Sequence, residues 1–166
     1  MNTTIDKKRK KRAKQTAEVF TPLNLCIDML NKIPDEVWVN PKATFLEPSC
    51  GDGMFVMQIM YKKILNGHNI EDVILSIHAR DIMKDNIEIC RIKILDLIKC
   101  ELKSYGLKRQ DFIKKMIDLC AIMLYNIRYT NDTLEEDFEK LKPWDESSNP
   151  TYIRNAKKYL KKRKYI

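Results

Sequence analysis

Residues 45–55 read Phe-Leu-Glu-Pro-Ser-Cys-Gly-Asp-Gly-Met-Phe, and this stretch carries the strongest structural signal in the chain. It begins as a short apolar strand that ends in an acid, Glu47, and passes through two glycines into a helical pattern. Gly51 and Gly53 can adopt the positive φ values of tight turns and allow a ligand to approach the backbone closely. The stretch therefore predicts a strand, a glycine turn and a helix, with a binding crevice at the turn.

The charge of this turn narrows the kind of ligand that it can hold. Glu47 and Asp52 place negative charge where a phosphate-binding loop has to avoid it, because phosphates bind at helix N-termini through backbone N–H groups. The two acids therefore disfavour a nucleotide phosphate. They favour a ligand with positive groups, such as the sulfonium and ammonium of S-adenosylmethionine.

The rest of the chain predicts one domain in which strands alternate with helices, since 166 residues with 44% hydrophobic content can bury a core. The expected elements are a helix from Pro22, capped by Thr21, to Pro34, a connection over 35–42, strands over 43–47, 73–80 and 125–130, and helices over 54–66, 84–103 and 108–123. Alternating elements predict an α/β fold with a parallel sheet and right-handed crossovers. Glu47, Asp81 and Asp132 follow the three strands, so we expect an acidic cluster at the carboxyl edge of the sheet.

Basic residues gather at the two ends of the chain. The net charge is +8, yet residues 1–14 carry seven basic and one acidic side chain, and residues 151–166 carry seven basic side chains and no acid. We interpret 1–14 as a basic N-terminal tail, 15–141 as the folded domain, and 142–166 as a loop and basic C-terminal tail with helical potential. Basic tails favour DNA as a partner, because neutralised phosphates release counterions. The alternative is that the tails are solvated and only aid solubility.

Cysteine usage and hydropathy predict a cytoplasmic protein without a membrane partner. The five cysteines are widely spaced and have no CxxC pair, so we expect no metal site. Cys26, Cys90, Cys100 and Cys120 fall in apolar helical patterns and are expected as buried, reduced thiols. The chain has no apolar run of the ~18 residues that a membrane span needs and no signal-peptide pattern.

Four elements, in order, resemble those of the class I S-adenosylmethionine-dependent methyltransferases, specifically the adenine-N6 DNA methyltransferases of restriction–modification systems and phages. They are Glu-Val-Phe-Thr-Pro at 18–22, the glycine turn at 47–55, Ala-Arg-Asp-Ile-Met-Lys-Asp-Asn at 79–86, and the segment 126–134. The resemblance covers about residues 15–135. It implies a Rossmann-like class I methyltransferase fold, a parallel sheet with flanking helices, in an incomplete form of about three to four strands.

The resemblance also implies roles in binding S-adenosyl-L-methionine. The residues concerned are Phe20, Thr21, Pro22, Glu47, Pro48, Gly51, Asp52, Gly53, Asp81, Ile82 and Asp132. The residues at 20–22 would close over the cofactor, Glu47 and Asp52 would face its amino-acid end, and Asp81 would accept its ribose hydroxyls. Ile82 would pack on the adenine. Each residue has a structural alternative: Asp81 as a helix cap, Asp132 as a turn residue, and Ile82 as part of the core.

The target base needs a second element, which the family builds as (Asp/Asn)-Pro-Pro-(Tyr/Phe) after a fourth strand. Asn149-Pro150-Thr151-Tyr152 differs from it at one position, so Asn149, Pro150 and Tyr152 are the catalytic candidates. No apolar strand precedes them, and a chance loop tetrapeptide is the alternative. The family's later strands are not visible, so we expect the outer edge of the first strand to be covered by the C-terminal tail, a second copy or a complementary subunit.

The sequence thus predicts a protein that transfers a methyl group to N6 of adenine in DNA, alone or with a complementary subunit. Two alternatives stay open. One is an inactive cofactor-binding remnant or a regulatory or accessory subunit of a split methyltransferase. The other is a basic accessory protein that binds DNA and no cofactor.

Overall fold

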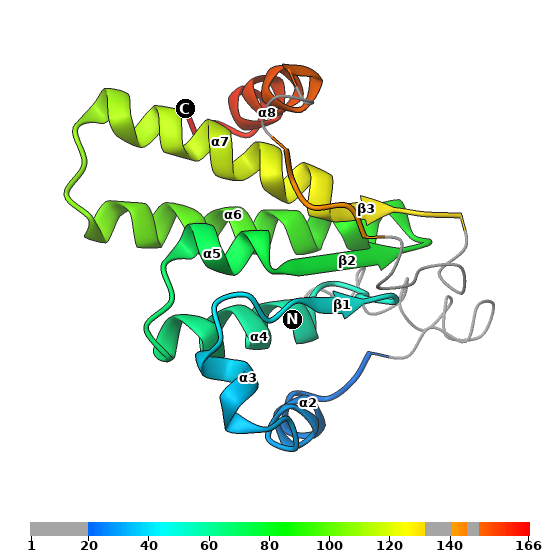
Figure 1. The fold of residues 1–166 in the computed structure, drawn as a ribbon. Helices are drawn as coiled ribbons and strands as arrows, with labels where there is room; N and C mark the ends of the chain where they lie inside the picture. Colours follow the sequence, from blue (N-terminus) through cyan, green and yellow to red (C-terminus); the bar gives the residue numbers. More distant parts are fainter. Residues whose placement is uncertain (1–19, 132–140, 146–149) are drawn as a thin grey trace, which may run out of the picture.

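A computed structural model describes residues 20–131, 141–145 and 150–166, and its centre is a parallel sheet in the order β1-β2-β3 (Figure 1). The strands are β1 (Phe45–Glu47), β2 (Ile77–Asp81) and β3 (Ile127–Tyr129). Glu47 pairs with Ala79, and Asp81 pairs with Tyr129. The prediction of an α/β fold with parallel strands and flanking helices is confirmed.

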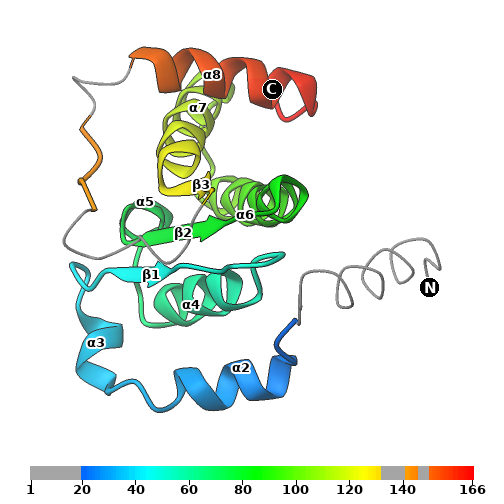
Figure 2. The same ribbon diagram turned by 90° about the vertical axis from the view of Figure 1, so that its right-hand side faces the viewer.

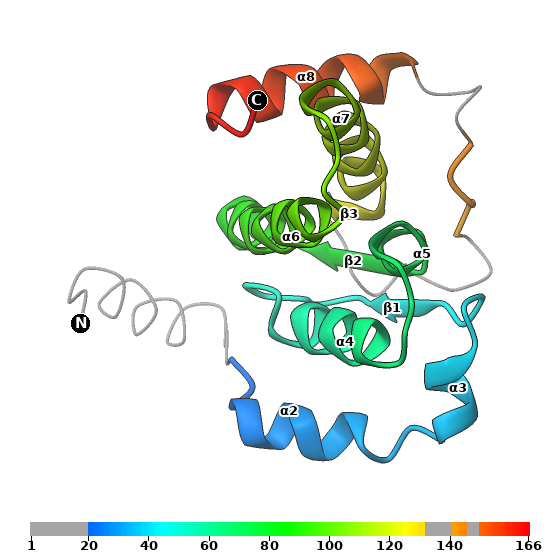
Figure 3. The same cartoon turned by 90° about the vertical axis from the view of Figure 1, so that its left-hand side faces the viewer.

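Helices connect these strands and cover the sheet. They are α2 (Leu23–Leu30), α3 (Asp35–Val39), α4 (Met54–Leu65), α5 (Ile70–Leu75), α6 (Lys84–Ser104), α7 (Arg109–Asn126) and α8 (Pro150–Lys162). Figures 2 and 3 show α5 and α6 on opposite faces of β2, with α7 beyond β3. All five residues of β2 are buried, as expected for the middle strand of a sheet covered on both faces.

The segment 73–80, predicted as one strand, is divided between a helix and a strand. Asn69 caps α5, because its Oδ1 accepts the Asp72 N–H at 2.9 Å. Buried Ile70, Val73 and Ile74 then follow helical spacing, and β2 begins only at Ile77. The cap therefore overrides the strand preference of the β-branched residues.

The connection predicted at 35–42 contains the short helix α3. Pro34 precedes it with extended backbone, and Asp35 and Glu36 stand in its first turn, where negative charge is favourable. Trp38 is 1% exposed and stacks on Phe45 of β1 with ring centroids 5.2 Å apart. The helix thus packs its buried Trp38 against the first residue of β1.

The C-terminal segment, expected as a loop and basic tail, contains the well-formed helix α8. Ala156 and Leu160 are fully buried, and the helix packs on α7. Figure 2 shows α8 at the end of the molecule opposite α2 and β1. The expectation that this segment covers the outer edge of β1 is therefore wrong. Within the described ranges, β2 is the one strand that pairs with β1.

Two further sequence expectations concern cysteines and membranes. The cysteines are free, and Cys100 is exposed rather than buried, whereas Cys26, Cys90 and Cys120 lie in the core as expected. Of the helices in the described residues, none has the length and apolar character that crossing a membrane requires.

Candidate functional site

Two acids lie at the carboxyl edge of the sheet, where β1 and β2 end. Glu47 is the last residue of β1, and its register partner Ala79 lies two residues before Asp81, the last residue of β2. Burial and the negative charge of Asp81 raise the pKa of Glu47, although the Ser49 N–H donates to its Oε1 at 3.1 Å and works against this shift. Burial is the larger cause of the raised pKa, and the negative charge of Asp81 adds to it.

Asp81 ties the end of β2 to the glycine turn. Its Oδ2 accepts the Gly51 N–H at 2.8 Å, and its Oδ1 accepts the Met83 N–H at 2.6 Å. The Cys50 N–H adds a bond to the Arg80 carbonyl oxygen at 2.8 Å. A carboxylate has about four acceptor positions, so a ligand hydroxyl would share these oxygens with the backbone donors. Asp81 is 5% exposed, and its Oδ1 also accepts from the Asn86 amide at 3.5 Å, so its carboxylate shapes the turn.

The two glycines of the turn each meet a constraint that a side chain would violate. Gly51 has φ +53°, and an added Cβ would lie 3.2 Å from Cε1 of Phe20. Gly53 has φ +90°, and an added Cβ would lie 2.6 Å from Sγ of Cys90 in α6. The turn is therefore held between the Phe20 ring and α6, which confirms a glycine requirement at both positions.

Asp52, expected to face the cofactor's amino-acid end, pairs with Lys93 of α6. The Lys93 Nζ lies 3.1 Å from Asp52 Oδ2 and donates to the Asp52 carbonyl oxygen at 2.9 Å. The Asp52 side chain is 13% exposed. Glu47 is therefore the acid of the turn with the stronger case for meeting a ligand cation. Sequence reasoning missed Lys93, because no local pattern links it to a turn 41 residues away.

Beneath the turn, two thiols from different elements meet. A hydrogen bond with Cys90 is the largest reason why the pKa of Cys50 is raised, followed by burial and the charges of Asp81 and Glu47. Both side chains belong to the core. Cys50 therefore stays a protonated packing residue and is unsuited to nucleophilic chemistry.

The rim of the site is partly apolar. Ile82 follows Asp81 and is 49% exposed, so it is free to contact a ligand. The Lys84 Nζ lies 4.8 Å from the ring centroid of Tyr129, at the end of β3.

The segment expected to close over the cofactor leads into α2. Pro22 serves as the N-cap of α2 and the helix begins at Leu23, so the prediction that Thr21 caps it is wrong. Pro48 is exposed beside Glu47.

The catalytic candidates lie away from the turn or outside the described residues. Asn149 lies outside them, as does Asp132, which was expected to bind the cofactor, and Pro150 begins α8. The Tyr152 ring meets Tyr125 and Trp144 edge-on, at centroid distances of 5.4 and 6.0 Å. Tyr125 stands just before β3, at the amino edge of the sheet, whereas Glu47 and Asp81 end their strands at the carboxyl edge. The structure therefore does not bring Tyr152 to the acidic turn, defined as Glu47, the glycine turn over residues 48–53 and Asp81.

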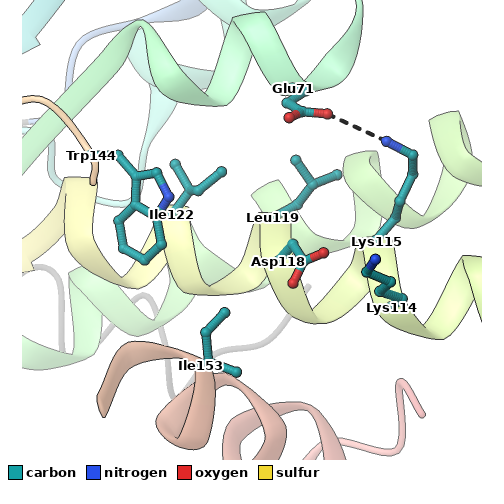
Figure 4. Close-up of a pocket in the computed structure, with 8 residues that line it drawn as sticks. All are labelled: Glu71, Lys114, Lys115, Asp118, Leu119, Ile122, Trp144 and Ile153. Carbon is teal, nitrogen blue, oxygen red and sulfur yellow. Dashed lines mark hydrogen bonds and ion pairs between the residues drawn. The ribbon is translucent and has the colours of Figure 1, made fainter. Parts of the chain in front are cut away.

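A pocket of about 320 Å³ lies between α5, α7 and α8 (Figure 4). Leu119, Ile122, Trp144 and Ile153 supply its apolar walls, and Glu71 pairs with Lys115 at 3.3 Å on its rim. None of the residues expected to bind the cofactor lines it. This pocket is therefore separate from the acidic turn.

Comparisons with known proteins identify no relative of this chain: no family model, no curated protein and no solved structure matches it.

Proposed function

We propose that the acidic turn binds S-adenosylmethionine, and that the protein is a DNA methyltransferase-like protein directed to N6 of adenine. One observation carries the proposal: Asp81, at the end of β2, accepts the N–H of Gly51 in the glycine turn that follows β1. This bond joins the carboxyl ends of two neighbouring parallel strands. Ligands of open α/β sheets bind outside the carboxyl ends of the strands.

The charge of the turn supports a cationic ligand over a dinucleotide. The pKa of half-buried Glu47 is raised by burial and by repulsion from the negative charge of Asp81. A phosphate bound beside these two acids would add to the repulsion. A sulfonium or ammonium group would reduce it. In the proposed complex, Asp81 accepts ribose hydroxyls, Glu47 attracts the positive groups, and Ile82 and Phe20 supply apolar contacts.

Transfer of the methyl group is a direct attack by the adenine amino nitrogen on the methyl carbon of the sulfonium. Bound S-adenosylmethionine would supply the methyl group: the C–N bond would form as the C–S bond breaks, the electron pair would pass to sulfur, and the nitrogen would release its proton to water. Such a step depends on positioning. Because Tyr152 is packed against Tyr125 and Trp144, we infer that base positioning needs a second chain or rearrangement, and that the isolated chain transfers methyl groups slowly or not at all.

Titration calorimetry tests the cofactor proposal with S-adenosylmethionine and with its thioether product, which lacks the sulfonium charge but keeps the ammonium. Glu47→Gln should weaken S-adenosylmethionine about three- to tenfold, because it removes a nearby negative charge. The same substitution should also weaken the thioether, by a smaller factor, because one of the two positive groups remains. Glu71→Gln is the matched control, since Glu71 pairs with Lys115 away from the turn. Absence of binding at millimolar concentration of either ligand would refute the proposal.

A second assay separates an enzyme from a binding protein. Transfer of tritiated methyl groups to duplex DNA is measured with the isolated chain, and light scattering after size exclusion gives its oligomeric state. Cofactor binding without transfer is the result expected of the isolated chain, and the remnant and accessory-subunit alternatives expect it too. A monomer that transfers methyl groups at an ordinary enzymatic rate contradicts the need for a second chain.

A further inference from the structure

Helix α8 separates its apolar and basic residues onto two faces. Ala156 and Leu160 are fully buried against the rest of the protein. The outward face holds exposed basic residues at helical spacing: Arg154, Lys157, Lys158, Lys161 and Lys162. No acid occurs in α8. At a rise of about 1.5 Å per residue, this row of charges is about 12 Å long.

The basic face is held in place by bonds at the C-terminal end of the helix. Tyr159 donates to Glu88 Oε2 of α6 at 3.0 Å, and Arg163 donates to the same oxygen. Beyond the helix, Tyr165 donates to Asp96 Oδ1 at 2.6 Å. Arg163 is thus used to fix the helix, and the five outward cations form a preorganised surface.

This arrangement has a cost that a polyanion would remove. Arg154 with Lys158, Lys157 with Lys161, and Lys158 with Lys162 are like charges four residues apart, and each such pair destabilises a helix by about 0.2–0.5 kcal/mol. Phosphates bound along the face would neutralise these charges and release counterions. The face therefore has the chemistry of a phosphate-backbone contact.

The burial of α8 also decides between two polyanionic surfaces. A basic helix that binds membranes inserts its apolar face among the lipids. Here Leu160 and Ala156 are already buried in the core, so only charge is available to the partner. Duplex DNA, with one negative charge per about 1.7 Å of its axis, fits a rigid row of cations better.

We propose that the outward face of α8 docks duplex DNA through its phosphate backbone, without reading sequence and without cofactor. The choice of DNA rests on the proposed function, whereas the phosphate chemistry rests on α8 alone. Helix α8 packs on α7, beyond β3, so DNA held on its outward face is anchored away from the acidic turn (Figure 1).

Fluorescence anisotropy of a labelled 20-base-pair duplex with the full chain, without cofactor, tests this proposal over a range of salt concentrations. The test variant combines Lys157→Gln, Lys158→Gln and Lys161→Gln. If three phosphate contacts are lost, the slope of log K against log salt should fall by about 2.7, since each contact contributes about 0.9. Affinity at low salt should fall at least tenfold.

The matched control combines Lys32→Gln, Lys42→Gln and Lys103→Gln, which removes the same charge from exposed positions on other elements. Its salt slope should stay close to that of the parent protein. Equal losses in both variants, or binding to phosphatidylserine vesicles without binding to DNA, would overturn the proposal. Thermal unfolding of each variant checks that it is folded. Loss of cofactor binding in the calorimetry leaves this inference standing, so the two proposals can fail separately.

Discussion

The outer helices at the two ends of the molecule differ in how fully they bury their apolar side chains (Figure 2). One end holds α2 beside β1, and the other holds α8 on α7. Helix α8 buries its apolar residues and exposes cations. Helix α2 buries Cys26 and Leu30 yet leaves four large apolar side chains 40–48% exposed: Leu23, Leu25, Ile27 and Met29. It stands at the end where the outer edge of β1 has no neighbour among the described strands.

The difference shows that the spacing of apolar residues decides whether packing against one neighbouring surface is enough to bury them. The basic residues of α8 repeat at helical spacing, so one neighbouring surface satisfies the apolar face. Helix α2 has a single charged residue, Asp28, and its apolar residues surround most of the axis. An exposed apolar surface beside an open strand edge is typical of an interaction site, which agrees with the proposed need for a second chain.

Core truncation should give the largest contrast between the ends. Leu160→Ala removes a fully buried side chain and should lower the free energy of unfolding by about 3 kcal/mol. Leu25→Ala, at a side chain 48% exposed, should change it by less than about 1 kcal/mol. Urea denaturation measures both. Similar losses at the two positions would show that α2 is packed as fully as α8.

Acid should destabilise the protein through His78, which pairs in register with Leu46 of β1. Burial, together with the charges of Arg80 and Arg128, lowers the pKa of His78 to about 4. The unfolded chain therefore binds more protons between pH about 6.5 and about 4, so stability is present above this window and falls as the pH drops through it. At pH 5 the loss relative to pH 7.5 should be about 2 kcal/mol.

The variant His78→Gln isolates this effect in denaturation measured from pH 7.5 to pH 4.5. It should flatten the acid side of the stability profile. Glu47 acts in the opposite sense, because its raised pKa makes the folded state bind more protons as the pH falls toward that pKa. An unchanged acid slope in His78→Gln would assign the acid sensitivity to other groups.

Weakening the bonds that tie α8 to Glu88 of α6 should have a smaller effect on stability. Glu88→Gln weakens the bonds from Tyr159 and Arg163, and because Glu88 is 37% exposed we expect a loss of only about 1 kcal/mol. Glu36→Gln, at an exposed position in the first turn of α3, is the control; it loses a favourable helix-dipole interaction and should cost no more than about 0.5 kcal/mol. Thermal unfolding in low and high salt measures both, and the Glu88→Gln effect should shrink in high salt.

The smallest effect is expected at the turn. Lys93→Gln removes the ion pair with Asp52, and with the Lys93 side chain 37% exposed the loss should be below about 1 kcal/mol. Cofactor affinity should change little, because we assign the ligand cation to Glu47. A large loss of S-adenosylmethionine binding in a well-folded Lys93→Gln protein would contradict that assignment.

Local sequence signals predicted the elements that depend on neighbouring residues. The apolar run before Glu47 predicted β1, the two glycines predicted the turn, and the helical spacing after Gly53 predicted α4 within one residue of its end. The strand predicted over 73–80 was wrong at residues 73–75, which belong to α5, where the Asn69 cap outweighed β-branched preference. Of the three candidates for covering the outer edge of β1, the C-terminal segment was wrong, because α8 packs on α7.

The sequence by itself determined the parallel α/β fold and the acids at the strand ends, because strand and helix periods and glycine turns are properties of adjacent residues. Only the tertiary structure decided which charges meet. It pairs Asp52 with Lys93, brings Asp81 to Gly51, and places Tyr152 against Tyr125. These contacts join segments far apart in the chain, and burial of the apolar faces of α6, α7 and α8 sets their geometry, which no local pattern encodes.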